Sequence, residues 1–184
     1  MPLSKPSRRT AQHTRTVVCT GYLRDDKLWD IEARMTDVKT HNVDNAERGG
    51  YVAGGEAFHD ISIRVTLDKG LHIHHVEPVI DESPFRMCSQ ITSAFKKLEG
   101  SRIGPGWQKQ ARALLGGVAG CTHLNDLLPV VATTAIQAIW PSSGKEGGEG
   151  VLKEGAKFML NSCHVWGQSS EMIKTYLPKH YIDK

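Results

Sequence analysis

The chain has 184 residues, of which 39% are hydrophobic and 23% are charged, and its formal net charge is +3. This size and composition predict a globular protein with a sizeable core and exclude a chain that is disordered throughout. Apart from a short basic start at Arg8 and Arg9, lysine and arginine are scattered, and no basic stripe with interleaved aromatic residues is present. Nucleic acid is therefore not expected as a partner.

The first fifteen residues lack the apolar core of a signal peptide, and no long apolar run follows elsewhere. We therefore expect a cytoplasmic protein with no membrane partner. The four cysteines are too sparse and too irregularly spaced for a disulfide framework, so reduced thiols are expected and metal or redox chemistry stays open.

Two hairpins are predicted in the first half of the chain. Residues 14–22 and 28–36 are strand-like and flank a polar loop at 24–27. Residues 58–67 alternate between apolar and polar side chains, and a turn at 68–70 leads into 71–80. Between the hairpins, residues 39–55 are rich in glycine, asparagine and charge, which predicts a long loop.

Helical spacing begins after Pro84 and predicts helices over 91–98, 107–115 and 124–139, with Pro129 expected to kink or break the last one. The expected fold class is α+β, an antiparallel sheet of two hairpins packed by about three helices. Residues 1–141 are expected to form the main domain, 142–150 a glycine-rich linker, and 151–184 a C-terminal tail that docks on the main domain.

Cys88 and Cys121 each precede a plausible helix N-cap, Ser89 and Thr122. The partial positive charge of a helix start favours a thiolate, which is the form that binds metal or attacks an electrophile. We therefore expect both cysteines to reach one metal, with the buried, inert thiol as the alternative. His123, two residues after Cys121, is expected to be a ligand or a proton carrier, with an exposed surface histidine as the alternative.

His59 lies on the apolar side of its strand, where it is either a metal ligand or a hydrogen-bonded core residue. Asp60 faces the opposite side of a regular strand, so the two residues can serve one metal only at a strand end or a bulge. His72, His74 and His75 fit a solvated strand face better than a metal cluster. The expected metal ligands are His59, Asp60, Cys88, Cys121 and His123, and the expected catalytic groups are Asp60 and His123.

The loop over residues 39–55 is expected to act as a lid, because its glycine pairs permit hinge motion. His41 and Arg48 in this loop are the expected substrate-binding residues, since both can meet an anionic group. The role of Cys163 and His164 in the tail stays open.

The order of hairpins, cysteines and helices over residues 56–139 is similar to the NifU-like iron–sulfur cluster scaffolds, whose motifs are Cys-Gly-Asp, a cysteine at a helix start, and His-Cys before a final helix. The matching positions here are Phe58-His59-Asp60, Cys88 and Gly120-Cys121. The chain departs from the pattern because Phe58 replaces the first cysteine and Gly120 replaces the histidine. The resemblance implies a mixed Asp, His and Cys ligand set, which suits zinc or iron.

Several segments resemble an uncharacterised bacterial family known as a domain of unknown function. They are Gly21-Tyr22-Leu23-Arg24-Asp25-Asp26, Leu28-Trp29-Asp30-Ile31-Glu32, Ile103-Gly104-Pro105-Gly106-Trp107 and Gly120-Cys121-Thr122-His123-Leu124. Members often accompany catabolic genes, including those for aromatic compounds, and this association implies an enzyme without naming its reaction.

Two functions are therefore expected. The first is a zinc- or iron-dependent lyase or hydrolase that acts on a small aromatic or carbonyl compound in bacterial catabolism. The second is a carrier or scaffold for iron–sulfur clusters or sulfur, with Cys88 and Cys121 as acceptors. A binding module with a structural metal is a third hypothesis, and homo-oligomer formation stays open.

Overall fold

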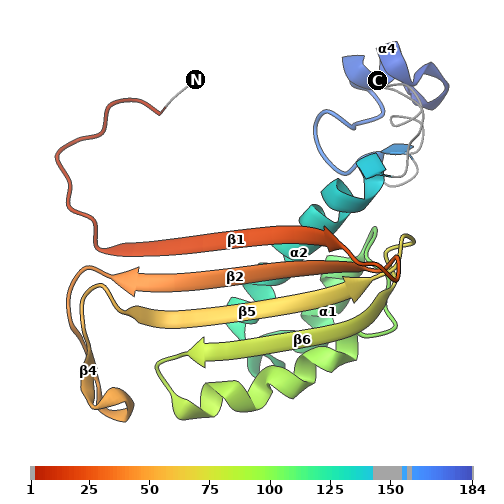
Figure 1. Ribbon diagram of the computed structural model, residues 1–184. Helices are drawn as coiled ribbons and strands as arrows, with labels where there is room; N and C mark the ends of the chain where they lie inside the picture. The colour runs from red at the N-terminus through yellow and green to blue at the C-terminus, as the bar shows by residue number, and fades with distance from the viewer. Residues whose placement is uncertain (1–2, 143–154, 157–158, 184) are drawn as a thin grey trace.

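A computed structural model describes residues 3–142, 155–156 and 159–183. Its main body is a four-stranded antiparallel sheet with strand order β1-β2-β5-β6. The strands are β1 (His13–Leu23), β2 (Trp29–Lys39), β5 (Ala57–Leu67) and β6 (Ile73–Glu82). Both predicted hairpins are present, and Figure 1 shows the four strands side by side with the helices behind them. The α+β class is confirmed.

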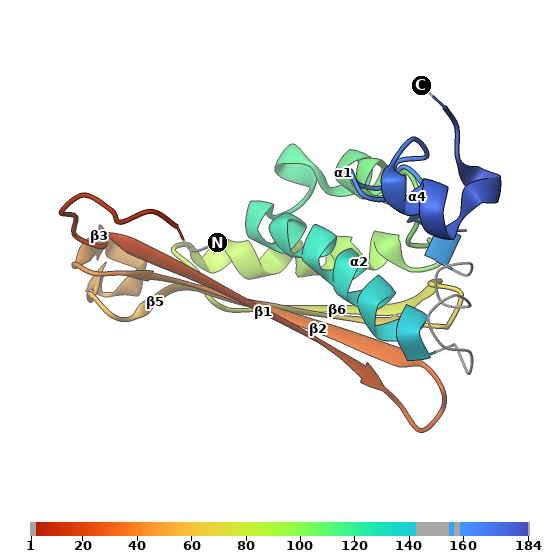
Figure 2. The ribbon, with the colours of Figure 1, turned by 90° about the horizontal axis from the view of Figure 1, so that it is seen from above.

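Helices cover one face of this sheet (Figure 2). They are the 3₁₀ helix η2 (Arg86–Leu98), α1 (Trp107–Leu115) and α2 (Thr122–Ser142), with the short turn η3 (Gly117–Ala119) between α1 and α2. The covered face is built by alternation, because every second residue of a strand points the same way. On β2 these residues are Trp29, Ile31, Ala33, Met35 and the single carboxylate Asp37, all buried.

The core lies between this face and the helices. Ile61 and Ile63 of β5 and Leu124 and Leu127 of α2 are among its buried members. Each such aliphatic side chain contributes roughly 1.5–3 kcal/mol through its removal from water. The other face of the sheet carries charged side chains that pair across strands. Arg64, for example, forms ion pairs with Glu32 and Glu77 at 2.7 Å each.

Residues 39–55 are not a structureless loop, contrary to the sequence prediction. They contain β3 (Val43–Asn45), the 3₁₀ turn η1 (Ala46–Arg48) and β4 (Gly50–Val52), and β3 and β4 form a small antiparallel sheet of their own. The chain reverses direction between β3 and β4 at Gly49 and Gly50, which both have positive φ. This glycine pair therefore forms a turn.

Two further predictions about helices are corrected or narrowed by the structure. Helix η2 begins at Arg86 with Phe85 as its cap residue, so Cys88 lies inside its first turn and Ser89 is not an N-cap. Pro129 was expected to kink or break its helix, and the structure excludes the break, because α2 continues through Pro129. A proline ring removes one helical hydrogen bond, and packing of the remaining residues keeps the helix.

The described part of the tail contains α4 (Glu171–Tyr176) and the 3₁₀ turn η4 (Pro178–His180). It has its own small apolar cluster, in which Trp166 packs edge-on against Trp140 of α2 at 5.9 Å between ring centroids. The predicted linker at 142–150 lies outside the described residues, apart from its first position.

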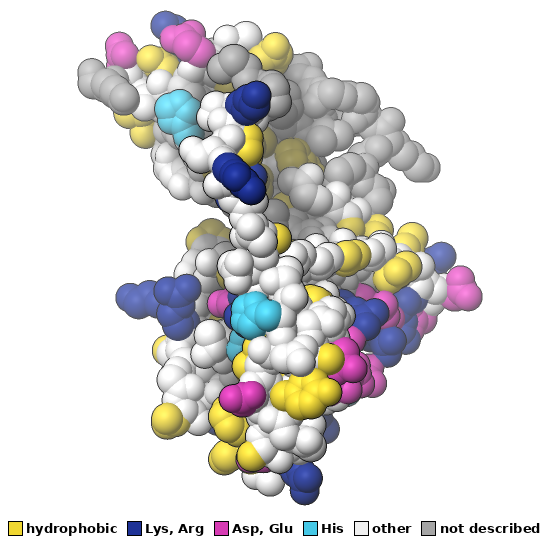
Figure 3. Space-filling model, turned by 90° about the vertical axis from the view of Figure 1, so that its left-hand side faces the viewer, with side chains coloured by type: hydrophobic (Ala, Val, Ile, Leu, Met, Phe, Trp, Pro, Cys, Tyr) yellow, Lys and Arg dark blue, Asp and Glu magenta, His cyan; other side chains and the backbone are white. Residues whose placement is uncertain are grey.

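No helix among the described residues is long and apolar enough to cross a membrane. Figure 3 shows the end of the molecule near β4, where acidic and basic side chains lie intermixed along the right-hand side of the view.

Candidate metal centre

Asp37 lies at the centre of a row of polar side chains that crosses three strands. Arg15 of β1 is directly opposite Asp37 of β2, and Asp37 is directly opposite His59 of β5. Opposed residues of neighbouring strands share a face, so all three point toward the helices. The pairing of β2 with β5 is irregular directly after Asp37, at the bulge beside Val38. The side chain of Asp37 is only 3% exposed.

Four groups contact the Asp37 carboxylate. Arg15 donates from Nε to Oδ1 at 2.8 Å and from Nη2 to Oδ2 at 2.9 Å. His59 Nδ1 lies 3.1 Å from Oδ2, and His13 Nε2 lies 3.1 Å from Oδ1. The Arg15 hydrogen bonds lower the pKa of Asp37 to about 2, against the opposing effect of burial. Asp37 is therefore ionised at neutral pH.

His123, in the first turn of α2, is the fourth group. Its Nε2 lies 3.7 Å from Asp37 Oδ2, and its ring centroid is 3.8 Å from that of His59. Burial lowers the pKa of both histidines, and for His59 the charge of His123 adds to the effect. Both rings are therefore neutral at pH 7, with a nitrogen lone pair available for a metal or a proton.

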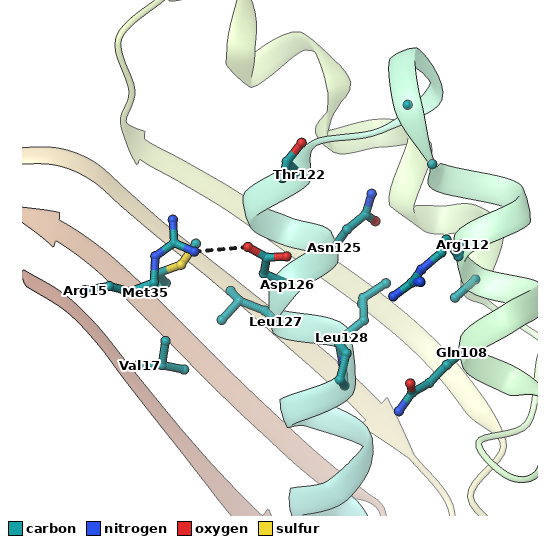
Figure 4. A pocket seen from close by; sticks show the side chains of 14 residues that line it. Arg15, Val17, Met35, Gln108, Arg112, Thr122, Asn125, Asp126, Leu127 and Leu128 are labelled. Atoms are coloured by element: carbon teal, nitrogen blue, oxygen red, sulfur yellow. Dashed lines mark hydrogen bonds and ion pairs between the residues drawn. The ribbon is translucent and has the colours of Figure 1, made fainter.

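Asp126 connects this arrangement to the surface. It accepts a hydrogen bond on Oδ2 from Arg15 Nη1 at 3.0 Å, as Figure 4 shows, and its side chain is 51% exposed. The pKa of Arg15, which lies between two carboxylates, is raised. We call the six residues the Asp37 cluster: His13, Arg15, Asp37, His59, His123 and Asp126.

Asp37, His59 and His123 form a group that could hold a metal ion, since one ligand atom of each lies within 4.8 Å of the other two. We call these three residues the ligand triad. Bonds of about 2.0–2.1 Å to a tetrahedral zinc place two ligand atoms roughly 3.3–3.4 Å apart. The distances from Asp37 Oδ2 to the two imidazole nitrogens, 3.1 and 3.7 Å, lie on either side of this value. Two histidines and one carboxylate are also the ligand set of non-haem iron enzymes.

The structure brings together two of the five ligands expected from sequence, His59 and His123. Asp60 lies on the opposite face of β5, where Arg34 donates to both of its carboxylate oxygens. Cys121 directly precedes α2 and packs partly buried against the core, and Cys88 is partly buried in η2. Neither cysteine belongs to the ligand triad.

Arg48 and His41, the expected substrate-binding residues, lie elsewhere. Arg48 bonds Glu82 of β6 and the carbonyl oxygen of Ala57 at 2.8 Å each, so it holds the β3–β4 unit against the main sheet. His41 is exposed between β2 and β3. Residues 39–55 contribute nothing to the lining of the cleft described below.

Sequence reasoning missed Asp37, Arg15, His13 and Asp126. One signal was available, because Ile31, Ala33 and Met35 define the buried side of β2 and Asp37 continues that series. A carboxylate at a position expected to be apolar indicates a partner or a function.

The family described as "Protein of unknown function (DUF2889)" matches residues 13–137. The chain belongs to this family. The matched range begins at His13 and extends into α2, so it includes all six residues of the Asp37 cluster. No curated protein and no solved structure matches the chain. The resemblance to NifU-like scaffolds therefore stays a prediction.

Proposed function

We propose that this protein is a metal-dependent enzyme, a lyase or hydrolase that acts on a small aromatic or carbonyl compound in the cytoplasm. The ligand triad carries the proposal. It combines an ionised carboxylate with two neutral imidazoles on one side of a sheet, which is a donor set that suits zinc or iron. A bound ion would polarise a substrate oxygen or activate water.

The remaining residues of the Asp37 cluster have separate roles in this proposal. Arg15 orients Asp37 through two hydrogen bonds and balances its charge. His13 contacts Oδ1 rather than Oδ2, and its side chain is 35% exposed, so it can exchange a proton with substrate or solvent. His123 becomes a ligand here, and Asp37 replaces Asp60 as the carboxylate.

The test is metal content and metal affinity. We expect the purified protein to bind one zinc or iron ion, measured by elemental analysis and by calorimetric titration of metal-free protein. His59→Ala and His123→Ala should each weaken binding by more than the roughly 10–100-fold loss that follows removal of an outer-sphere residue. His74→Ala is the matched control, because His74 is exposed on β6 and contacts Asp68. Full metal content in both triad variants would overturn the proposal.

The cysteine variants separate this ligand set from the one expected from sequence. Cys88→Ala and Cys121→Ala should keep the bound metal, since the ligand triad contains no thiol. An iron–sulfur carrier would behave differently. Anaerobic reconstitution would then yield a brown protein whose colour depends on Cys88 and Cys121.

A second candidate function is metal-free proton transfer by His59. The 3.1 Å contact between His59 Nδ1 and Asp37 Oδ2 resembles the carboxylate–histidine pair of a general base, in which the carboxylate orients the ring. A protein that binds neither zinc nor iron at micromolar concentration would favour this function over the first.

A further inference from the structure

A cleft of about 580 Å³ lies along the amino-terminal half of α2. This volume falls within the range of about 300–1,000 Å³ that is usual for small-molecule sites. Its polar lining residues are Arg15, Gln108, Arg112, Thr122, Asn125 and Asp126. Arg15 and Asp126 also belong to the Asp37 cluster, so the cleft borders the candidate metal centre. We call it the Arg112 cleft.

Arg112, in the last turn of α1, is a cation without a partner in the described part of the chain. The sheet arginines differ in this respect. Arg15, Arg34 and Arg64 each contact one or two carboxylates at 3.0 Å or less. Because Arg15 is committed to Asp37 and Asp126, Arg112 supplies the unmatched positive charge of the cleft. A guanidinium fork is the group best suited to bind a carboxylate through two hydrogen bonds.

Asn125 is a second polar residue in the lining of the cleft. Its Nδ2 donates to the carbonyl oxygen of Leu115 at 2.6 Å. Since that carbonyl can only accept, the orientation of the amide is determined, and Oδ1 is the free atom. Oδ1 is buried and has no hydrogen-bond partner among the described residues. An unsatisfied buried acceptor costs about 1–3 kcal/mol.

The two groups lie on the same side of α2. Figure 4 shows Asn125 and Arg112 directed into the space between α2 and α1, whereas Asp126 meets Arg15 on the side of the sheet. Apolar side chains complete the lining, including Ala111, Leu128 and Pro129. The cleft therefore offers one cation, unpaired among the described residues, beside an apolar wall.

We propose that the Arg112 cleft binds a small organic acid with an apolar body, whose carboxylate is held by Arg112. This inference rests on the proposed function only in regarding the acid as the substrate of the adjacent Asp37 cluster. Binding itself requires no metal, so the two proposals can fail separately.

The experiment is an NMR titration of the isotope-labelled, metal-free full chain with 4-hydroxybenzoate and with its neutral analogue 4-hydroxybenzamide. We expect saturable binding of the acid with a Kd of roughly 1 mM or lower, and shifts concentrated in residues 108–128. The amide should bind at least about tenfold more weakly, because it lacks the charge that Arg112 neutralises. Arg112→Gln should weaken binding of the acid by a similar factor.

Lys109→Gln is the matched control, since Lys109 is an exposed cation on the same helix that does not line the cleft. It should bind the acid as the wild type does. Equal affinity for acid and amide, or unchanged binding by Arg112→Gln, would overturn the inference. A protein that holds metal but does not bind the acid overturns this inference alone, whereas one that binds the acid but holds no metal overturns the metal-dependent function alone.

Discussion

Asp37 is a carboxylate at a position where the neighbouring inward residues of β2 are apolar. Burial of a charge costs several kcal/mol unless it is paired and hydrogen-bonded. Here Arg15 donates two hydrogen bonds, and His13 and His59 each place a ring nitrogen 3.1 Å from a carboxylate oxygen. A single residue therefore organises the Asp37 cluster, and the surrounding groups offset its desolvation.

Replacement of Asp37 should destabilise the protein far more than replacement of Asp60. Asp37→Asn leaves Arg15 facing a neutral amide in a buried setting, so we expect the free energy of unfolding to fall by about 2–3 kcal/mol. Asp60→Asn removes an ion pair with Arg34, whose side chain is 62% exposed, and should cost less than about 1 kcal/mol. Urea unfolding of EDTA-treated proteins measures both values. Equal losses would show that Asp37 has no special role in stability.

The same carboxylate predicts an acid dependence of stability. The folded-state pKa of Asp37, about 2, is lower than its usual value of 3.8. Its stabilising contribution is therefore complete above the unfolded value and is lost as the pH falls from about 4 through about 2. The shift corresponds to about 2 kcal/mol. The stability difference between wild type and Asp37→Asn should accordingly shrink across this window in metal-free protein. A constant difference would contradict the assignment.

Among the secondary-structure elements, α2 is the one whose start fixes the position of His123. The chain turns from α1 to α2 in a few residues, and a Cβ atom at Gly120 would lie only 2.1 Å from the carbonyl oxygen of Leu115. Asn125 reinforces this corner through its hydrogen bond to the same oxygen. Close backbone contact thus holds the first turn of α2, and with it His123, over β2 and β5.

Gly120→Ala should therefore impair the metal centre from a distance. We expect a loss of about 1–3 kcal/mol in the free energy of unfolding, because the backbone at Leu115 must move to admit the methyl group. Metal affinity should fall as well, since His123 moves with the helix start. Gly104→Ala is the control, because a Cβ at Gly104 meets no atom within 4 Å. Calorimetric metal titration and urea unfolding of both variants test this. Wild-type metal affinity in Gly120→Ala would show that the corner does not position His123.

At the scale of the whole molecule, the described residues contain two apolar clusters. The large one joins the sheet to η2, α1 and α2, and the small one joins the tail residues Trp166, Ile173 and Leu177 to the end of α2. The family match stops at residue 137, before the tail. The Asp37 cluster lies entirely within the large body.

A chain that ends after Ser142 should therefore still fold and bind metal. We expect a loss of about 1–2 kcal/mol in stability, because Trp140 loses its contact with Trp166. Thermal unfolding and the metal content of the shortened protein check this, with the full chain measured in parallel. A shortened chain that is unfolded or free of metal would show that the tail is part of the same folding unit.

Local patterns in the sequence were sufficient to predict most of the strands and helices. Alternation placed His59 on the covered side of its strand and Asp60 on the other side, and helical spacing delimited α1 at the observed residues 107–115. Such patterns depend on residues only a few positions apart, which is why they can be seen without a structure. They failed for residues 39–55 and for the start of η2, where turns and caps rather than periodicity set the boundaries.

The site itself was decided by tertiary structure. Arg15 and Asp37 are 22 residues apart, as are Asp37 and His59, and their convergence depends on which strands pair and in which register. His123 joins them only because α2 crosses the sheet at that end. The sequence by itself determined an α+β protein with His59 facing inward and His123 at a helix start. Long-range strand register and helix docking, which no local pattern encodes, placed Asp37 between them.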